Sequence, residues 1–175
     1  YVIFHSTSER WSRCYDHQRL AEVADYLIVM AYDQHTVRAG SVASLPWVER
    51  GVARMLEDVP AEKLLLGVPL YTRLWKEETD ENGEVKTTRS TLTLPQAEKW
   101  IRDNAVTIVV DNDSGQHYAE VQRGEAVYKM WLEDEYSQKK RVALMKKYHL
   151  AGIAAWRRGL EKEETWRELT ELLKR

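Results

Sequence analysis

Three apolar runs, separated by helical patterns, constrain the fold of this chain most. They are DYLIVMAYD at 25–33, KLLLGVPLY at 63–71 and LAGIAAW at 150–156. Each run is short and does not alternate apolar with polar residues, which is typical of parallel strands buried on both faces. The opening run YVIFH at 1–5 predicts one further short strand.

Amphipathic segments lie between the apolar runs. Apolar residues at helical spacing predict helices at 14–24, 44–59, 137–149 and 163–175. In the second of these, Ser44 is suited to the N-cap and Pro46 to the first turn. Strands alternating with helices predict an α/β fold of parallel strands joined by crossover helices. This pattern fits both an open doubly wound sheet and part of an eight-stranded barrel.

Residues 75–130 interrupt the alternation. An Asn82-Gly83 pair between polar arms indicates a two-residue hairpin turn. A second hairpin is expected to turn at 113–115, and a short helix is expected between the two, at 93–104. We therefore predict a small α+β insertion here. The predicted division of the chain is 1–74, 75–130 and 131–175.

Charge and composition limit the classes of ligand. The 26 basic and 28 acidic side chains are interleaved and give a net charge of −2, so we expect no nucleic-acid or membrane partner. The chain has 16 tryptophans and tyrosines but one phenylalanine. Flat aromatics with a polar group suit sugar-binding sites, although they are also common at the margins of ordinary cores.

Cysteine and histidine give no sign of a metal or cofactor site. Cys14 is the one cysteine, so the chain forms no internal disulfide. The five histidines are scattered without metal-ligand spacing, and a lone loop histidine such as His35 is more often solvated than part of a site. We expect neither a metal nor a cofactor.

Candidate site residues stand at the carboxyl ends of the apolar runs, where parallel α/β folds bind their ligands. Side chains two apart on a strand share a face, so Met30 and Tyr32 are expected to point the same way, as are Pro69 and Tyr71, and Ala154 and Trp156. The set offers aromatic planes, one carboxylate and hydrogen-bond donors, but no nucleophile paired with a base. An alternative is that Met30 and Trp156 are only core residues. The candidates are Met30, Tyr32, Asp33, Tyr71, Arg73 and Trp156.

Three segments of the chain resemble a known family. They are VMAYD at 29–33, LLLGVPLYTR at 64–73 and the long run from Trp131 to Glu161. They are similar to the later strands of glycoside hydrolase family 18, and more narrowly to its bacterial chitinase-like and spore-cortex-lytic N-acetylglucosaminidases. The resemblance implies that the chain is the C-terminal half, strands five to eight, of a (β/α)8 barrel.

The resemblance also implies roles for the candidate residues. Met30, Tyr32 and Asp33 match the Met-x-Tyr-Asp motif of the family's sixth strand. By this likeness, Tyr32 would hydrogen-bond the N-acetyl group of the substrate, and Asp33 would bind sugar hydroxyls near the scissile bond. Trp156 would form the floor of the adjacent subsite. Tyr71 and Arg73 would line the wall of the cleft.

One departure from the family concerns the catalytic acid. The family's general acid is the glutamate of an Asp-x-x-Asp-x-Asp-x-Glu motif, and this sequence contains no such run. Catalysis in the family is substrate-assisted, with this glutamate protonating the leaving oxygen. We therefore expect the chain to bind N-acetylated polysaccharides or oligosaccharides but to be inactive as a hydrolase by itself. The resemblance implies a secreted, cell-wall or spore-envelope location.

Two functions remain open, with a third less favoured. In the first, the chain is part of a retaining glycosidase acting on chitin-like or peptidoglycan-like polymers, and the catalytic glutamate lies upstream of Tyr1. In the second, it is a non-enzymatic half barrel that binds N-acetylated sugars or is purely structural, and pairs as a homodimer to cover its open edges. The third, an open sheet binding a phosphorylated small molecule, lacks a glycine-rich phosphate loop.

Overall fold

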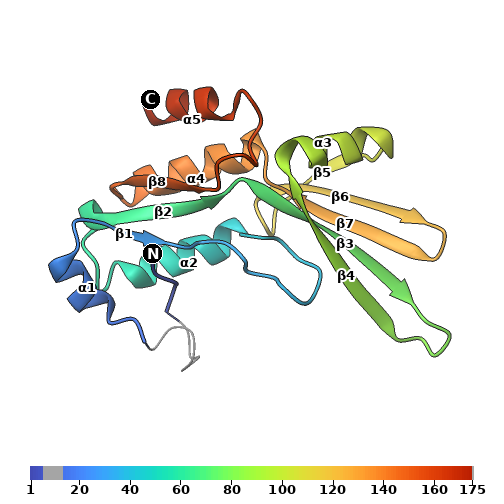
Figure 1. The fold of residues 1–175 in the computed structure, drawn as a ribbon, viewed down its shortest axis with the longest axis horizontal. Helices are drawn as coiled ribbons and strands as arrows, with labels where there is room; N and C mark the ends of the chain where they lie inside the picture. The colour runs from blue at the N-terminus through green and yellow to red at the C-terminus, as the bar shows by residue number, and fades with distance from the viewer. Residues whose placement is uncertain (6–13, 175) are drawn as a thin grey trace.

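A computed structural model describes residues 1–5 and 14–174 and shows two sheets joined end to end (Figure 1). The first sheet has three parallel strands in the order β1-β2-β8. Their bounds are Leu27–Val29 for β1, Leu64–Pro69 for β2 and Gly152–Trp156 for β8. Val2 adds a single parallel bridge to Val29, where a short strand was predicted.

Four α-helices accompany the parallel strands, as the apolar spacing predicted. They are α1 (His17–Val23), α2 (Leu45–Met55), α4 (Glu135–Lys147) and α5 (Thr165–Lys174). A short 3-10 helix, η1 (Ala61–Lys63), leads into β2. The alternation confirms an α/β fold. The parallel strands of the described residues form an open sheet, not a closed barrel.

The main core lies between the parallel sheet and its helices. β2 is buried along most of its length as predicted, although Leu65 is only half-buried. Removing these side chains from water is the main driving force that holds helices and sheet together. The central members of this core are Val29, Leu64, Leu66, Val68, Val48, Val52, Met55 and Val142.

The prediction that β8 is buried on both faces was wrong. Its residues are half-buried, and Trp156 is 45% exposed. The reason is its position, because β8 is at the edge of the sheet and pairs with β2 alone among the described strands. An apolar run can identify a strand without revealing whether a neighbour covers it.

The segment between β2 and α4 forms a five-stranded antiparallel sheet in the order β4-β3-β7-β6-β5. Helix α3 (Leu94–Asp103) packs on it through a small core that includes Ala97 and Met130. The strands are β3 (Tyr71–Thr79), β4 (Val85–Thr93), β5 (Ile108–Asp111), β6 (Gln116–Arg123) and β7 (Ala126–Leu132).

Both predicted hairpins are present, but the first does not have the predicted two-residue turn, because residues 80–84 separate β3 from β4. Gly83, with φ of 81°, turns β3 into β4, and Gly115, with φ of 73°, turns β5 into β6. Glycine suits these positions because a positive φ carries no Cβ penalty there. Thr93 caps α3 with a complete capping box. Ser44 stands at the predicted N-cap of α2, but its side chain makes no capping hydrogen bond.

The two sheets meet at the carboxyl end of β2. β2 ends at Pro69 and β3 begins at Tyr71, so only Leu70 separates them. The backbone N–H of Leu70 donates to the carbonyl oxygen of Trp156 at 2.7 Å, which ties the end of β8 to this junction. The first residues of β3 are therefore brought beside the ends of the parallel strands. No helix of the described chain is long and apolar enough to cross a membrane.

Candidate functional site

The structure brings five of the six predicted site residues together where the two sheets meet. Each follows or ends a parallel strand, and the five are connected by hydrogen bonds or ring contacts. We call them the strand-end cluster: Tyr32, Asp33, Tyr71, Arg73 and Trp156.

Asp33 is the centre of this cluster. The Tyr71 hydroxyl donates to Asp33 Oδ1 at 2.6 Å, and Arg73 Nη2 donates to the same oxygen at 2.5 Å. The Arg73 side chain is 7% exposed, whereas that of Asp33 is 50% exposed. Both contacts approach from the protein side, so the carboxylate is fixed in direction while half of it still faces solvent. Such a group can accept hydrogen bonds from a bound ligand.

The backbone at Asp33 helps to direct this carboxylate. Its φ is 63°, in the left-handed region. Aspartate is among the few residues besides glycine and asparagine that adopt this conformation readily. The chain therefore turns sharply after the Tyr32 position, and the Asp33 side chain meets Tyr71 and Arg73, which come from the next sheet.

The loop after Asp33 is fixed by contacts that the sequence did not reveal. His35 Nδ1 lies 2.9 Å from the carbonyl oxygen of Ser41, and the Gln34 side-chain oxygen accepts from the Ser44 backbone N–H at 2.8 Å. Arg73 donates to the His35 carbonyl oxygen as well as to Asp33. The contacts of His35 thus hold the loop in place. No local spacing predicts these contacts, since they depend on how the loop folds back.

Three aromatic rings lie beside the carboxylate. The Tyr32 ring lies 6.4 Å from the Tyr71 ring at an interplanar angle of 74°, and 6.4 Å from the Trp156 ring at 22°. Tyr32 is half-buried between them, and Trp156 presents much of its indole to solvent. A cis peptide bond joins Trp156 to Arg157. An exposed indole beside a fixed carboxylate is suited to a ligand with one apolar face and several hydroxyls.

Both tyrosines of the cluster are neutral at physiological pH. Burial, reinforced by the negative charge of Asp33, raises the pKa of the Tyr32 phenol to about 12. The pKa of Tyr71 is also raised, by burial and by its hydrogen bond to Asp33. Tyr32 can therefore donate a hydrogen bond across the pH range of a cell.

Met30 is half-buried, and its backbone N–H donates to the Val2 carbonyl oxygen at 2.8 Å. Met30 and Tyr32 both follow the end of β1 at Val29, so the prediction that their side chains share a face stays a prediction. A contact between the Met30 side chain and a ligand stays a prediction as well.

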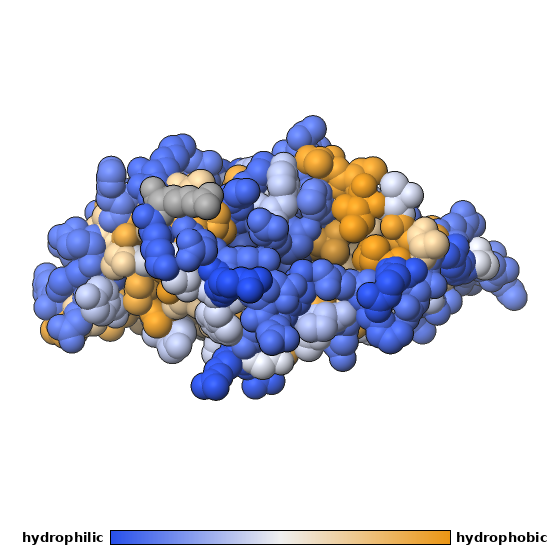
Figure 2. Space-filling model, turned by 90° about the horizontal axis from the view of Figure 1, so that it is seen from above, coloured by the Kyte–Doolittle hydropathy of each residue, from blue (hydrophilic) through white to orange (hydrophobic). Residues whose placement is uncertain are grey.

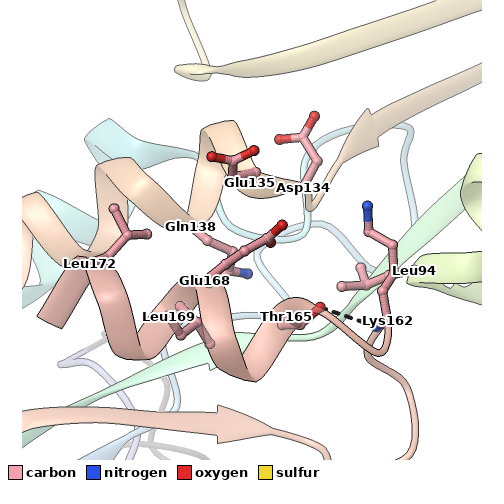
Figure 3. A pocket seen from close by; sticks show the side chains of 9 residues that line it. All are labelled: Leu94, Asp134, Glu135, Gln138, Lys162, Thr165, Glu168, Leu169 and Leu172. Carbon is pink, nitrogen blue, oxygen red and sulfur yellow. Dashed lines mark hydrogen bonds between the residues drawn. The ribbon is translucent and has the colours of Figure 1, made fainter.

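A small, partly open cavity lies away from this cluster, between α4, α5 and the start of α3 (Figure 3). Its volume of about 10 Å³ is near the minimum for a single water molecule. In Figure 3, Asp134 and Glu135 at the start of α4 lie on one side, and Lys162 and Thr165 on another. The cavity is too small for a sugar ring. Its lining residues are Leu94, Asp134, Glu135, Gln138, Lys162, Thr165, Glu168, Leu169 and Leu172.

The acidic residues before α4 have structural partners. Asp134 caps α4 through the Ser137 backbone N–H at 3.1 Å. Glu133 is buried and accepts from Arg141 Nη2 at 2.6 Å and from Gln116 Nε2 at 2.8 Å. A carboxylate enclosed in this way is not available to protonate a leaving group.

Two of the histidines that are scattered in the sequence lie together in the structure. His5 and His17 contact each other, and Asp58 contacts His5. These are the described residues that could hold a metal ion. Their separations along the chain follow no metal-binding motif, so sequence spacing could not identify them.

Comparison with known proteins agrees with the α/β fold. The family model described as glycosyl hydrolases family 18 matches residues 2–161. The uncharacterized glycosylase YvbX of Bacillus subtilis (strain 168) is 26% identical over 165 residues, which are 93% of this chain and 46% of that protein.

A second curated protein and a solved structure are also similar to this chain over nearly its whole length. A cortical fragment-lytic enzyme of Bacillus anthracis is 26% identical over 161 residues, or 90% of this chain and 36% of that protein. The crystal structure of a chitinase from Chromobacterium violaceum ATCC 12472 matches with a TM-score of 0.86 at 23% identity, covering 99% of this chain and 54% of the chitinase. The chain therefore spans less than half of these two curated relatives. Because the family model covers nearly all of the sequence, this chain belongs to glycosyl hydrolase family 18.

Proposed function

We propose that this chain supplies part of the sugar-binding site of a glycosidase acting on N-acetylglucosamine-containing polymers such as chitin or peptidoglycan. The observation that carries the proposal is the strand-end cluster, in which a fixed, half-exposed carboxylate lies beside a neutral phenol and an exposed indole. The relatives support it, because they include a chitinase and a cortical fragment-lytic enzyme.

Each residue of the cluster has a role in this proposal. The Tyr32 hydroxyl donates to the oxygen of the substrate's N-acetyl group, and Asp33 accepts from sugar hydroxyls. Trp156 stacks against the apolar face of one sugar ring. Arg73 and Tyr71 hold the carboxylate in place through their contacts with Asp33 Oδ1. Met30 borders the site next to Tyr32.

The proposed architecture is the second half of a (β/α)8 barrel. In it, the Val2 bridge, β1, β2 and β8 are strands five to eight, and the segment 75–130 is the insertion between 1–74 and 131–175. Support comes from the parallel order β1-β2-β8, with Val2 beside β1, and from the coverage of only about half of the chitinase.

Hydrolysis requires a general acid. This chain lacks the Asp-x-x-Asp-x-Asp-x-Glu motif whose glutamate serves as that acid in the family. Glu133, near the third apolar run, is bound to Arg141 and Gln116 in the interior. We therefore propose that the chain binds and orients the N-acetyl group, whose oxygen attacks the anomeric carbon in substrate-assisted catalysis. The proton for the leaving oxygen would come from a glutamate outside the chain.

The experiment that tests the acetamido role is calorimetric titration of the chain with chitotetraose and with cellotetraose, which lacks acetamido groups. We expect tighter binding of chitotetraose. Tyr32→Phe should reduce that preference, because it removes the hydroxyl that donates to the acetyl oxygen. Tyr26→Phe is the matched control, since Tyr26 is exposed and precedes β1 at the opposite end of the strand.

Two results would reject the assignment. One is equal affinity of the unchanged chain for both oligosaccharides. The other is a Tyr32→Phe variant that binds chitotetraose as tightly, and as selectively, as the unchanged chain does.

A second candidate function is a non-enzymatic N-acetyl-sugar-binding module that forms homodimers. The open edge of β8, with half-buried Ile153 and exposed Trp156, favours it. Unpaired strand edges and apolar faces promote association. In sedimentation velocity this candidate predicts a species of twice the 20.5 kDa chain mass, whereas a folded monomer at all concentrations would exclude it.

A further inference from the structure

Three metal-ligand side chains from separate segments meet on the helical side of the parallel sheet, outside the strand-end cluster. His5 ends the opening segment, His17 is the first residue of α1, and Asp58 follows α2. His5 Nε2 lies 2.7 Å from Asp58 Oδ2 and 3.2 Å from His17 Nδ1. One ligand atom from each residue lies within 4.8 Å of the others.

The hydrogen bonding of His17 sets the tautomer that a metal requires. His17 Nε2 lies 3.0 Å from the carbonyl oxygen of Ile3, which can only accept a hydrogen bond. Nε2 therefore carries the proton, and Nδ1 presents a lone pair toward His5 and Asp58. A backbone carbonyl that orients the second nitrogen is the usual outer partner of a metal-binding histidine.

The His5 ring is directed at the same point. Its Nδ1 is buried and has no hydrogen-bond partner among the described residues, so its polar contacts all lie on the Nε2 side. There, Nε2 faces both a lone pair of His17 and a carboxylate oxygen of Asp58. A metal ion at their meeting point would satisfy all three.

The exposure of the three side chains agrees with a cation site. His5 is 24% exposed and Asp58 39% exposed at the side chain, so an ion can enter from solvent. His17 itself is buried, which makes it the fixed member of the group.

We propose that His5, His17 and Asp58 bind a divalent transition-metal ion, with Zn²⁺ the best match. Two imidazoles and one carboxylate are a ligand set of intermediate softness that suits Zn²⁺ and not Mg²⁺ or Ca²⁺. Metal–ligand bonds of about 2.0–2.2 Å require these atoms to stand roughly 3 Å apart, close to the contacts that His5 makes. A water molecule would complete the coordination.

The consequence of such a site is a tie between three parts of the fold. The opening segment makes only a single backbone bridge to β1, through Val2. A metal bound by His5, His17 and Asp58 would fasten that segment to α1 and to the end of α2. Because binding occurs in the folded state alone, zinc would stabilise the chain by linkage.

The test is calorimetric titration of the EDTA-treated, dialysed chain with ZnCl2, with thermal unfolding followed in parallel. We expect one Zn²⁺ per chain, a rise in Tm with zinc, and no heat from MgCl2. Asp58→Asn and His5→Gln should each weaken zinc binding by about tenfold or more, the scale seen even for outer-shell changes. Both positions are partly exposed, so the variants should fold, as circular dichroism in EDTA would verify.

A matched control comes from another histidine. His149 lies outside the group and has φ of 52°, which asparagine also accepts, so His149→Asn should bind zinc as the unchanged chain does. The proposal fails if the chain binds no zinc, or if Asp58→Asn and His5→Gln both bind it with unchanged affinity. It also fails if Cys14→Ser abolishes binding while both of those variants retain it.

Discussion

At the scale of single residues, the strand-end cluster shows which parts of a site a sequence can reveal. The motif around Tyr32 and Asp33, and its position at a strand end, could be predicted because strand ends collect ligand groups in parallel folds. The hydrogen bonds of Arg73 to Asp33 and to the His35 carbonyl oxygen could not be predicted, since they join residues 38 or more apart in the sequence. The meeting of His5 and His17 with Asp58 was missed for the same reason.

Trp156→Ala tests whether the exposed indole is a binding surface. We expect chitotetraose affinity to fall by about 1–3 kcal/mol, the size typical of an aromatic anchor in a binding site. The side chain is 45% exposed, so the unfolding free energy should change less than for a core tryptophan. Calorimetric titration measures the first quantity and urea unfolding the second.

Trp166→Ala is the control for this change. Trp166 lies on α5, is 42% exposed, and donates to Glu161 at 2.8 Å, away from the cluster. Its loss should leave sugar affinity unaltered. Equal losses from the two substitutions, or none from Trp156→Ala, would show that Trp156 is not part of the sugar site.

At the scale of elements, the predictions succeeded where local signals are strong. The Asn82-Gly83 pair located the hairpin of β3 and β4, though not its turn length or strand bounds, and Thr93 located the start of α3. Strand β7 was not predicted, because the residues AVYKMWL form a strand largely through pairing with two neighbouring strands. It pairs with β3 on one side and β6 on the other. The exposure of β8 likewise depends on what lies beside it, which its own residues do not encode.

A buried ion pair joins the end of β7 to α4 and to the loop before α2. Arg141 Nη2 donates to Glu133 at 2.6 Å and to the Ala43 carbonyl oxygen at 2.8 Å, and Gln116 Nε2 also donates to Glu133 at 2.8 Å. This network lies where the antiparallel sheet adjoins the helices of the parallel sheet. We infer that it sets how β7 connects to α4.

Glu133→Gln tests this connection. The change leaves the Arg141 cation buried without its anion, so we expect the unfolding free energy to fall by about 3–5 kcal/mol. The double variant Glu133→Gln with Arg141→Met should recover much of the loss, because no lone charge remains. Urea unfolding of the four proteins of this cycle gives the coupling between the two side chains.

Glu125→Gln is the control, since Glu125 is exposed in the turn before β7. Its effect should stay within about 0.5 kcal/mol, as for ordinary surface substitutions. If Glu133→Gln is as stable as this control, the ion pair does not hold the two parts together.

At the scale of the whole molecule, the surface is incompletely covered. Figure 2 shows apolar side chains gathered toward the end that carries the antiparallel sheet. The edge strand β5 exposes Ile108, Val109 and Val110, and β8 exposes Trp156 at the other sheet. Open edges of this kind are sites of association with other chains or segments. The α/β fold class followed from strand and helix periodicity, which left both an open sheet and part of a barrel as alternatives.

The central claim is that the ends of β1, β2 and β8 together bind an N-acetylated sugar. The most direct measurement is a nitrogen-15 NMR titration with chitotetraose that follows the indole N–H signals of the seven tryptophans. Spectra of Trp156→Phe and Trp166→Phe assign the two signals that matter. We predict that the Trp156 signal shifts saturably while the Trp166 signal stays in place. A Trp156 signal that does not move at millimolar chitotetraose, or that moves no more than that of Trp166, would contradict the claim.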